Sequence, residues 1–318
     1  MFDQIIDANV NRIGEGLRVI EEYVRFVVAD DILAKKIAQF RQDIHSIFPQ
    51  EPQHLLIRDI EKDARAKHKA RERRDVKDVL TANFKRVQEA LRVLEEYCAE
   101  ARCSNMRYDM YQLEKDILLG LLKPQIRPGF YLVSANPEHI KAAFNEESVS
   151  LIQYRDKHIS KQAYFEKAKE LKAFSNAFNT PFIINDFIDI AIRLDADGFH
   201  SGQDDISVCE QRQLLGPHKL IGRTTHTAEQ GKIAESQGAD YVSVGPIWET
   251  PSKPGRPAIG FDYLKEAQAQ LTVPYVAIGG INSRNIQDVL IQRPPLIGIV
   301  RAFEELPTLS ALLKEHSK

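Results

Sequence analysis

The sequence contains only three cysteines, and none stands in a CxxC pair or at a spacing typical of metal ligands. This argues against a disulfide framework and against a cysteine-based metal site. Such cysteine usage is typical of a protein in a reducing compartment. The three residues are Cys98, Cys103 and Cys209.

Long apolar runs and a charge excess are also missing. Nowhere do about 18 apolar residues follow one another, so no segment is expected to span a membrane. The chain begins MFDQIIDANVNR, without the basic and apolar regions of a signal peptide. A formal net charge of −2 provides no general attraction to nucleic acid or to an anionic membrane. We therefore expect a soluble, cytoplasmic protein that binds neither.

The chain has 318 residues, of which 43% are hydrophobic, enough for two domains with separate cores. Its first part contains a repeat: residues 8–23 and 82–97 are identical at ten of sixteen positions. Both copies carry apolar residues at helical spacing, and a second helical stretch follows each, at 37–48 and 110–121. Residues 1–125 are therefore predicted to form two helical hairpins packed as a four-helix bundle.

One charged segment separates the two copies of the repeat, and a second segment separates the helical part from the rest of the sequence. Residues 58–75 are highly charged and are predicted to form a solvated loop or an exposed helix. Residues 123–129, KPQIRPG, contain two prolines and a glycine, which end the last helix of the bundle. A second domain is expected over residues 126–318.

In this second domain short β-rich runs alternate with helical stretches. Eight strands are expected, at residues 130–134, 150–154, 182–185, 198–201, 220–224, 241–245, 275–279 and 296–300. The alternation predicts an α/β fold, and eight strands with crossover-length connections favour a (β/α)8 TIM barrel. A doubly wound open sheet is the alternative, but no GxGxxG follows the first strand. In such barrels the chemistry lies at the carboxyl ends of the strands.

The second strand ends in QYRDK, where Arg155 and Lys157 can face one side of an extended segment. Two such cations can bind a diphosphate, although a solvated charged loop would look the same. Asp186 follows the third strand, and Asp204 and Asp205 follow the fourth. These carboxylates predict a Mg²⁺-diphosphate site, with helix N-caps as the alternative. His200 is interpreted as structural.

The remaining strand ends supply hydroxyls and glycines. Thr224 follows the fifth strand, and Thr227 is predicted to cap the next helix. The long proline-rich segment 245–255 suits an active-site flap. Gly280 and Arg301 follow the last two strands, where barrels commonly bind phosphate. Two phosphate sites in one mouth predict two phosphorylated substrates.

Four segments, QYRDK, IINDFIDIAIRLDADGFHSGQDD, HTAEQGKIAESQGADYVSVGPIWETPSKP and AIGGIN, resemble the thiamine-phosphate synthase family in this order. The resemblance covers residues 128–305. It implies a transferase that joins hydroxymethylpyrimidine diphosphate to a thiazole phosphate or its carboxylated form. It also implies Mg²⁺ bound by Asp186 and Asp205.

The resemblance further implies the substrate contacts. Residues with a catalytic role would be Arg155, Lys157, Thr224 and Lys253. The pyrimidine-diphosphate segment would comprise Gln153, Tyr154, Arg155, Asp156 and Lys157, with Asn185 and Thr224. The thiazole-phosphate positions would be Thr250, Ser252, Gly280, Val300 and Arg301, with Lys253 on the diphosphate. Ser252 replaces a common Thr, Thr224 a common Ser, and Arg301 a frequent Ser.

The helical part resembles a family proposed to act as an alternative hydroxymethylpyrimidine-phosphate kinase, although it contains no GxxxxGK[ST] loop. The polar residues repeated in both copies, and the run at residues 58–63, could line a site. The alternative explanation for these residues is packing and interhelical ion pairs, in a unit that serves scaffolding or homo-oligomer formation. For the barrel, the alternatives are a thiazole tautomerase and a non-enzymatic binding scaffold of the thiamine pathway.

Overall fold

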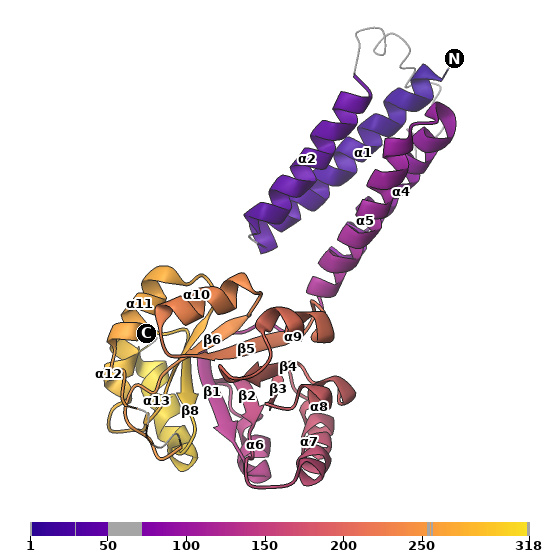
Figure 1. The fold of residues 1–318 in the computed structure, drawn as a ribbon. Helices are drawn as coiled ribbons and strands as arrows, with labels where there is room; N and C mark the ends of the chain where they lie inside the picture. The colour runs from indigo at the N-terminus through magenta and orange to yellow at the C-terminus, as the bar shows by residue number, and fades with distance from the viewer. Residues whose placement is uncertain (1, 29, 50–71, 253–254, 256, 317–318) are drawn as a thin grey trace. The chain divides into compact units, whose positions relative to one another are not determined.

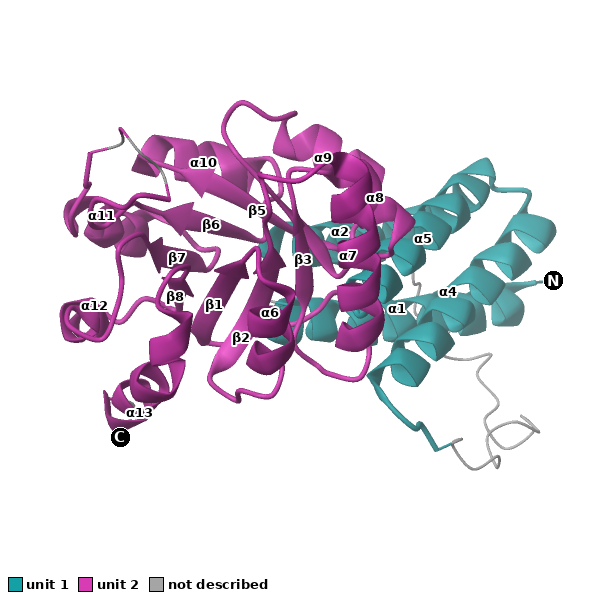
Figure 2. Ribbon diagram, turned by 90° about the horizontal axis from the view of Figure 1, so that it is seen from below, with its two compact units in different colours: residues 1–122 teal, residues 123–318 magenta. Residues whose placement is uncertain are grey.

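The computed structural model describes residues 2–28, 30–49, 72–252, 255 and 257–316. Most of the charged segment 58–75 and the whole of the run at 58–63 lie outside the described residues, as does Lys253. The chain divides into two compact units, Met1–Leu122 and Lys123–Lys318 (Figure 2). Among the described helices, none is long and apolar enough to cross a membrane.

In the described residues of the first unit, four long α-helices pack around one apolar core (Figure 1). They are α1 (Asp3–Tyr23), α2 (Asp31–Ile47), α4 (Val76–Cys98) and α5 (Ala101–Gly120), and a π-helical turn, η1 (Val24–Val28), extends α1. Asp30 and Asp75 cap α2 and α4 by accepting hydrogen bonds from backbone N–H groups of the first turn. The helical prediction from the repeat is confirmed.

The second unit is a closed barrel of eight parallel strands in sequential order (Figure 1). The strands are β1 (Gly129–Ser134), β2 (Val149–Tyr154), β3 (Phe182–Asn185), β4 (Gly198–Ser201), β5 (Leu220–Thr225), β6 (Tyr241–Val244), β7 (Tyr275–Ile278) and β8 (Leu296–Ile299). All eight lie within one residue of the bounds expected from the sequence. The predicted barrel is therefore confirmed over the open sheet.

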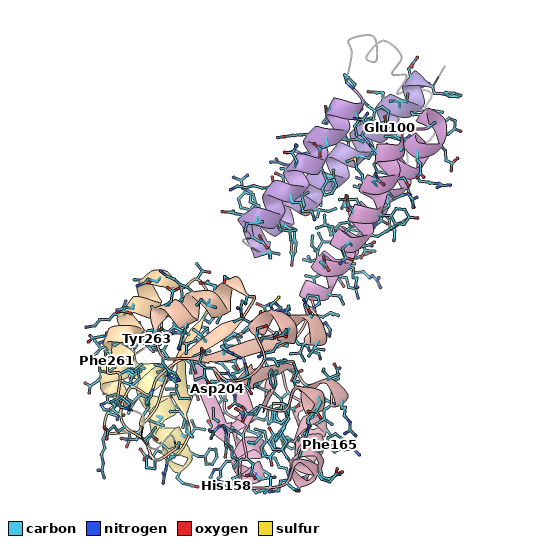
Figure 3. All side chains as sticks on the ribbon, in the orientation of Figure 1. Glu100, His158, Phe165, Asp204, Phe261 and Tyr263 are labelled. Carbon is cyan, nitrogen blue, oxygen red and sulfur yellow. The ribbon has the colours of Figure 1, made fainter. Side chains whose placement is uncertain are left out.

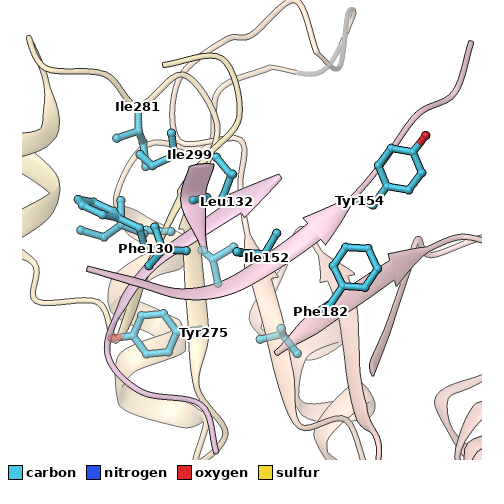
Figure 4. Close-up of a cluster of buried hydrophobic side chains, with 14 of the residues drawn as sticks. Phe130, Leu132, Ile152, Tyr154, Phe182, Tyr275, Ile281 and Ile299 are labelled. Atoms are coloured by element: carbon cyan, nitrogen blue, oxygen red, sulfur yellow. The ribbon is translucent and has the colours of Figure 1, made fainter. Parts of the chain in front are cut away.

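Helices cover the outside of the barrel. They are α6 (Pro137–Ala143), α7 (Lys161–Ser175), α8 (Ile188–Arg193), α9 (Val208–Leu215), α10 (Ala228–Ser236), α11 (Asp262–Gln270), α12 (Ile286–Ile291) and α13 (Leu306–His316), with a 3-10 turn, η2 (Phe303–Glu305), before the last. The outward strand residues pack against these helices in a large apolar core, part of which Figure 4 shows around Phe130, Ile152 and Phe182.

The inward residues form a second, smaller core inside the barrel. It contains Tyr131, Leu151, Ile183, Leu220 and Tyr241, all at most 1% exposed. Side chains alternate between the two cores along each strand, as the two-residue period of a strand requires. This alternation decides which residues at the strand ends can reach the barrel mouth.

Candidate active site

A cavity of about 310 Å³ opens at the carboxyl ends of the strands. All eight strands or the segments that follow them contribute to its lining. Among the residues expected at the site, its lining includes Gln153, Arg155, Lys157, Asn185, Asp186, Thr224, Thr250, Ser252 and Val300. Residues from far apart in the sequence therefore share one concave surface, which is the usual setting of a barrel active site.

The end of β2 presents cations to the cavity and apolar groups to the core. Arg155 and Lys157 line the cavity, as their alternation predicts. Within the described residues the guanidinium of Arg155 has no ion-pair partner, so it is available to an anionic ligand. Tyr154 points the other way, into the outer core, and packs against Tyr164 with ring centroids 4.5 Å apart. Asp156 does not line the cavity, and its carboxylate lies 3.7 Å from the Lys167 ammonium.

Asp186 follows β3 in a strained turn. Its backbone has a φ of +61°, which few residues other than glycine adopt, although Asp and Asn tolerate it. The N–H of Phe187 donates to the carbonyl of Asn185 at 2.7 Å across this turn. The Asp186 carboxylate lies 3.2 Å from the Lys157 ammonium. The helix N-cap alternative is wrong for Asp186, because Phe187 occupies that position of α8.

The two acidic residues after β4 differ in orientation. Asp204 lines the cavity, whereas the Asp205 carboxylate accepts a hydrogen bond from the Gly202 N–H at 2.6 Å. Neither caps a helix, because Ser207 is the N-cap of α9. The described residues contain no group of three or more His, Cys, Asp or Glu side chains placed to hold a metal ion. Any cation here would therefore need oxygen ligands from substrate or water as well.

Arg223, on β5, holds the acidic loop in place. Its guanidinium donates to the Ser201 hydroxyl at 3.0 Å and to the backbone carbonyls of Ile206, Gln203 and Asp205 at 3.0, 3.1 and 3.3 Å. Burial lowers the pKa of Arg223, while the nearby Asp205 and Asp204 act in the opposite direction. No role for Arg223 was expected from the sequence. An arginine inside an apolar strand was the available signal, because a buried cation requires hydrogen-bond partners.

Five buried side chains form a hydrogen-bonded chain beneath the cavity. Gln153 Nε2 donates to the Tyr131 hydroxyl at 2.7 Å, and the hydroxyls of Tyr131 and Tyr241 are 2.9 Å apart. His200 Nδ1 lies 3.2 Å from the Tyr241 hydroxyl, and its Nε2 lies 3.1 Å from the Thr224 hydroxyl. His200 thus bonds its neighbours, as expected, but it also lines the cavity.

A second cavity, of about 390 Å³, adjoins the first and shares Thr250 and Val300 with it. Gly280 and Arg301 line this second cavity, as do Asn282 and Arg284. Gly280 has a φ of +74°, and a Cβ there would lie 2.8 Å from the Trp248 Cβ, so only glycine fits. The residues expected at two ligand sites therefore divide between two neighbouring hollows.

Two further residues follow β5 and β6. Thr227 caps α10 by accepting from the Gln230 N–H at 3.2 Å, so the cap prediction is confirmed. His226 was not anticipated; it lines the first cavity, and its Nδ1 lies 3.0 Å from the Gly245 carbonyl.

In the helical unit, several of the repeated polar residues take part in packing and ion pairs. Asn9 and Asn83 are buried, and each donates to the backbone carbonyl four residues earlier. Ion pairs recur at equivalent positions: Arg18 with Glu22, and Arg92 with Glu96. Arg86 and Glu15 form a pair between α4 and α1 at 3.9 Å. These contacts account for several of the repeated residues without a ligand.

Comparisons with known proteins match both units. The family model for thiamine monophosphate synthase matches residues 130–303, and the model for the ThiD2 family matches residues 4–116. The chain is 40% identical over 322 residues to a thiamine-phosphate synthase from Nostoc sp., with 96% of this chain and 91% of the relative covered. It is 38% identical over 316 residues to another from Synechocystis sp., with 95% and 91% covered.

A solved structure is also similar to the barrel. A thiamine phosphate pyrophosphorylase from Pyrococcus furiosus superposes with a TM-score of 0.52 at 25% identity. The similarity covers 61% of this chain and 98% of that protein.

Proposed function

The chain belongs to the thiamine-phosphate synthase family, and we propose that its barrel joins 4-amino-2-methyl-5-(diphosphooxymethyl)pyrimidine to a thiazole phosphate, releasing diphosphate. One observation carries the assignment of the site. Arg155, Lys157 and Asp186 line a single cavity, and a second hollow with Gly280 and Arg301 shares two residues with it. One cavity suits the diphosphate of the pyrimidine, and the other suits the phosphate of the thiazole.

The diphosphate end of the pyrimidine substrate would lie against Arg155 and Lys157. An arginine can bind two phosphate oxygens at once, whereas a lysine acts as a point charge. Gln153, Asn185 and Thr224 would contact the pyrimidine side, because they line the same cavity and carry uncharged polar groups. Lys253 would add a further cation to the diphosphate, as the family resemblance implies.

Mg²⁺ fits the oxygen donors at this edge of the cavity. We propose that Asp186 and Asp205 hold it, with substrate diphosphate oxygens and water completing the ligand set. The chemistry that Mg²⁺ supplies when bound is neutralisation of the charge that develops on the departing diphosphate. Asp204 also lines the cavity, so Asp204→Asn and Asp205→Asn should be compared to decide which carboxylate is the ligand.

In the proposed reaction the bond between the pyrimidine methylene carbon and the diphosphate oxygen breaks first. Its electron pair leaves with the diphosphate, where Arg155 and Lys157 stabilise the charge. The aminopyrimidine ring stabilises the methylene cation that remains. The thiazole nitrogen then donates its lone pair to this carbon and forms the new C–N bond, so no protein nucleophile is required.

The thiazole phosphate would occupy the second cavity. Gly280 lets the backbone come close to an anion, and Arg301 adds a cation beside it. Thr250 and Val300 line both cavities, so they would lie between the two substrates. Ser252 lines the first cavity near the same boundary, and its N–H donates to the Thr250 hydroxyl at 3.3 Å.

The test is to incubate the full chain with the pyrimidine diphosphate, thiazole phosphate and Mg²⁺ and to measure both diphosphate and thiamine phosphate. Formation of both products supports the synthase. Isomerisation of a carboxylated thiazole phosphate without diphosphate release would instead identify a tautomerase. Binding of both ligands with no product would identify a scaffold.

For the helical unit we propose phosphorylation of the pyrimidine monophosphate by a nucleoside triphosphate, which would supply the substrate of the barrel. The match of residues 4–116 to the ThiD2 family supports this proposal. The packing and ion-pair contacts of its repeated polar residues support scaffolding or self-association as the alternative. Incubation with pyrimidine monophosphate, ATP and Mg²⁺ decides: pyrimidine diphosphate forms only if the unit is a kinase.

A further inference from the structure

The hydrogen-bonded chain beneath the first cavity connects two groups that face the ligand. Its ends are Gln153 on β2 and Thr224 on β5, which both line the cavity, as do Tyr131 and His200 between them. Between them stand Tyr131, Tyr241 and His200, which are 1%, 0% and 6% exposed. Because these groups are buried, each hydrogen bond is costly to leave unmade and the chain has a defined arrangement.

The hydrogen-bonded chain of side chains has a direction from donor to acceptor. Gln153 donates to the Tyr131 hydroxyl, and the Tyr131 proton can then be donated to the Tyr241 hydroxyl. With this direction the Tyr241 hydroxyl donates its proton to His200 Nδ1, which acts as the acceptor. A neutral His200 consequently carries its proton on Nε2 and donates to the Thr224 hydroxyl.

The two tyrosines remain protonated and so can act as donors. Burial raises the pKa of Tyr131 well above its ordinary value, and burial likewise raises the pKa of Tyr241. The neighbouring Gly222 makes room for them: a Cβ at this position would lie 2.2 Å from the Tyr241 ring and 2.4 Å from His200 Nδ1. A side chain at position 222 would therefore displace the middle of the chain.

We infer that Tyr131, Tyr241 and His200 are positioning residues that fix the donor and acceptor directions of Gln153 and Thr224 toward the pyrimidine substrate. With Nε2 turned to Tyr131, the side-chain oxygen of Gln153 is an acceptor left for the cavity. The Thr224 hydroxyl, which accepts from His200, keeps its own proton to donate. The inference rests on the proposed function, since it concerns how that substrate is selected.

This arrangement selects an amino group over an oxo group on the pyrimidine. A 4-aminopyrimidine presents an N–H donor beside a ring-nitrogen acceptor, and the 4-oxo compound presents the reverse pattern. A site built for one pattern rejects the other strongly, because buried polar groups are left unpaired. The three positioning residues would act on this selection without touching the reacting atoms.

The experiment compares Tyr241→Phe and Tyr131→Phe, each of which removes one hydroxyl from the chain, with Tyr263→Phe as the matched control. Tyr263, on α11 (labelled in Figure 3), is also buried, and its hydroxyl bonds Thr225 in the outer layer rather than in the cavity. For each full-length variant we would measure kcat/KM with the 4-amino and the 4-oxo pyrimidine diphosphates. Binding of both compounds would be measured separately by calorimetry.

In Tyr241→Phe and Tyr131→Phe we expect kcat/KM for the 4-amino substrate to fall. The ratio of kcat/KM for the 4-amino compound to that for the 4-oxo compound should fall by about tenfold or more, the effect of losing one good polar contact. The KM for thiazole phosphate should not change, and Tyr263→Phe should keep the wild-type ratio. Equal ratios in all four proteins, or equal loss for both substrates, would overturn the inference. A wild-type protein that binds the pyrimidine but forms no product would overturn the proposed function instead.

Discussion

The ammonium of Lys157 lies 3.2 Å from a carboxylate oxygen of Asp186, across the ends of β2 and β3. One residue was expected to bind the diphosphate and the other the metal ion. The ion pair holds these opposite charges together at the cavity. Binding of a metal-diphosphate would exchange this contact for two others, Lys157 with phosphate and Asp186 with the cation.

Lys157→Ala should therefore separate the two roles. We expect turnover to fall by about 10²–10³-fold, because a cation that stabilises the leaving group is lost. The Mg²⁺ concentration for half-maximal rate should stay the same or fall, because Asp186 no longer has a competing partner. Lys161→Ala is the control, since Lys161 forms a similar 2.9 Å pair with Asp189 outside the cavity. A raised Mg²⁺ requirement in Lys157→Ala would contradict this account.

Asp186→Asn should abolish most of the activity without loss of stability. Asn tolerates a positive φ as well as Asp does, so the strained turn is retained while the charge is removed. We expect turnover to fall by orders of magnitude, as it should for Asp186→Ala and Arg155→Ala, with a free energy of unfolding within about 0.5 kcal/mol of wild type. Steady-state kinetics and urea unfolding measure the two quantities. Near-normal rates would remove the metal assignment.

Arg223→Lys should loosen the acidic loop after β4. A lysine cannot reproduce the bonds that the guanidinium makes to three carbonyls and a hydroxyl. Each buried acceptor left unpaired costs about 1–3 kcal/mol, so the free energy of unfolding should fall by at least that amount. The Mg²⁺ requirement should rise because Asp204 and Asp205 lose their support. Thermal unfolding and Mg²⁺ titration of the rate check both effects, and an unchanged Mg²⁺ requirement would speak against the second.

Tyr154→Phe tests whether this residue contacts substrate through its side chain. The hydroxyl is buried and has no hydrogen-bond partner among the described residues. Because an unpaired buried hydroxyl is unfavourable, we expect the free energy of unfolding to stay the same or to rise by about 1 kcal/mol. Turnover should remain at the wild-type level, since the ring lies in the outer core. A large loss of turnover in a stable variant would show a substrate contact.

Glu100, labelled in Figure 3, should make the helical unit sensitive to acid. Its hydrogen bonds to Arg102 lower its pKa from 4.5 to about 2. The stabilisation from this carboxylate is therefore complete above about pH 4.5 and is lost as the pH falls toward 2. Glu100→Gln should lower the thermal midpoint at pH 6, and this difference from wild type should vanish near pH 2. A difference that persists in acid would indicate that the charge is unimportant.

The sequence determined the order and type of the elements. Apolar residues at helical spacing fixed the helices of the repeat, and eight short β-rich runs fixed the strands of the barrel. Local alternation also placed Arg155 and Lys157 on the same side of β2. These properties depend on neighbours along the chain, so they can be seen without a structure.

Only the tertiary structure decided which of the polar strand-end groups meet. The sequence places Asp204 and Asp205 side by side after β4, and the family resemblance indicated Asp205 as the metal ligand, but of the two only Asp204 lines the cavity, while one Asp205 carboxylate oxygen accepts from the Gly202 N–H. The sequence provides no reason to connect Gln153 with Thr224, which are joined through Tyr131, Tyr241 and His200 from three other strands. Closure of the barrel brings these residues together, and the orientation of each then follows from the need to pair every buried polar group.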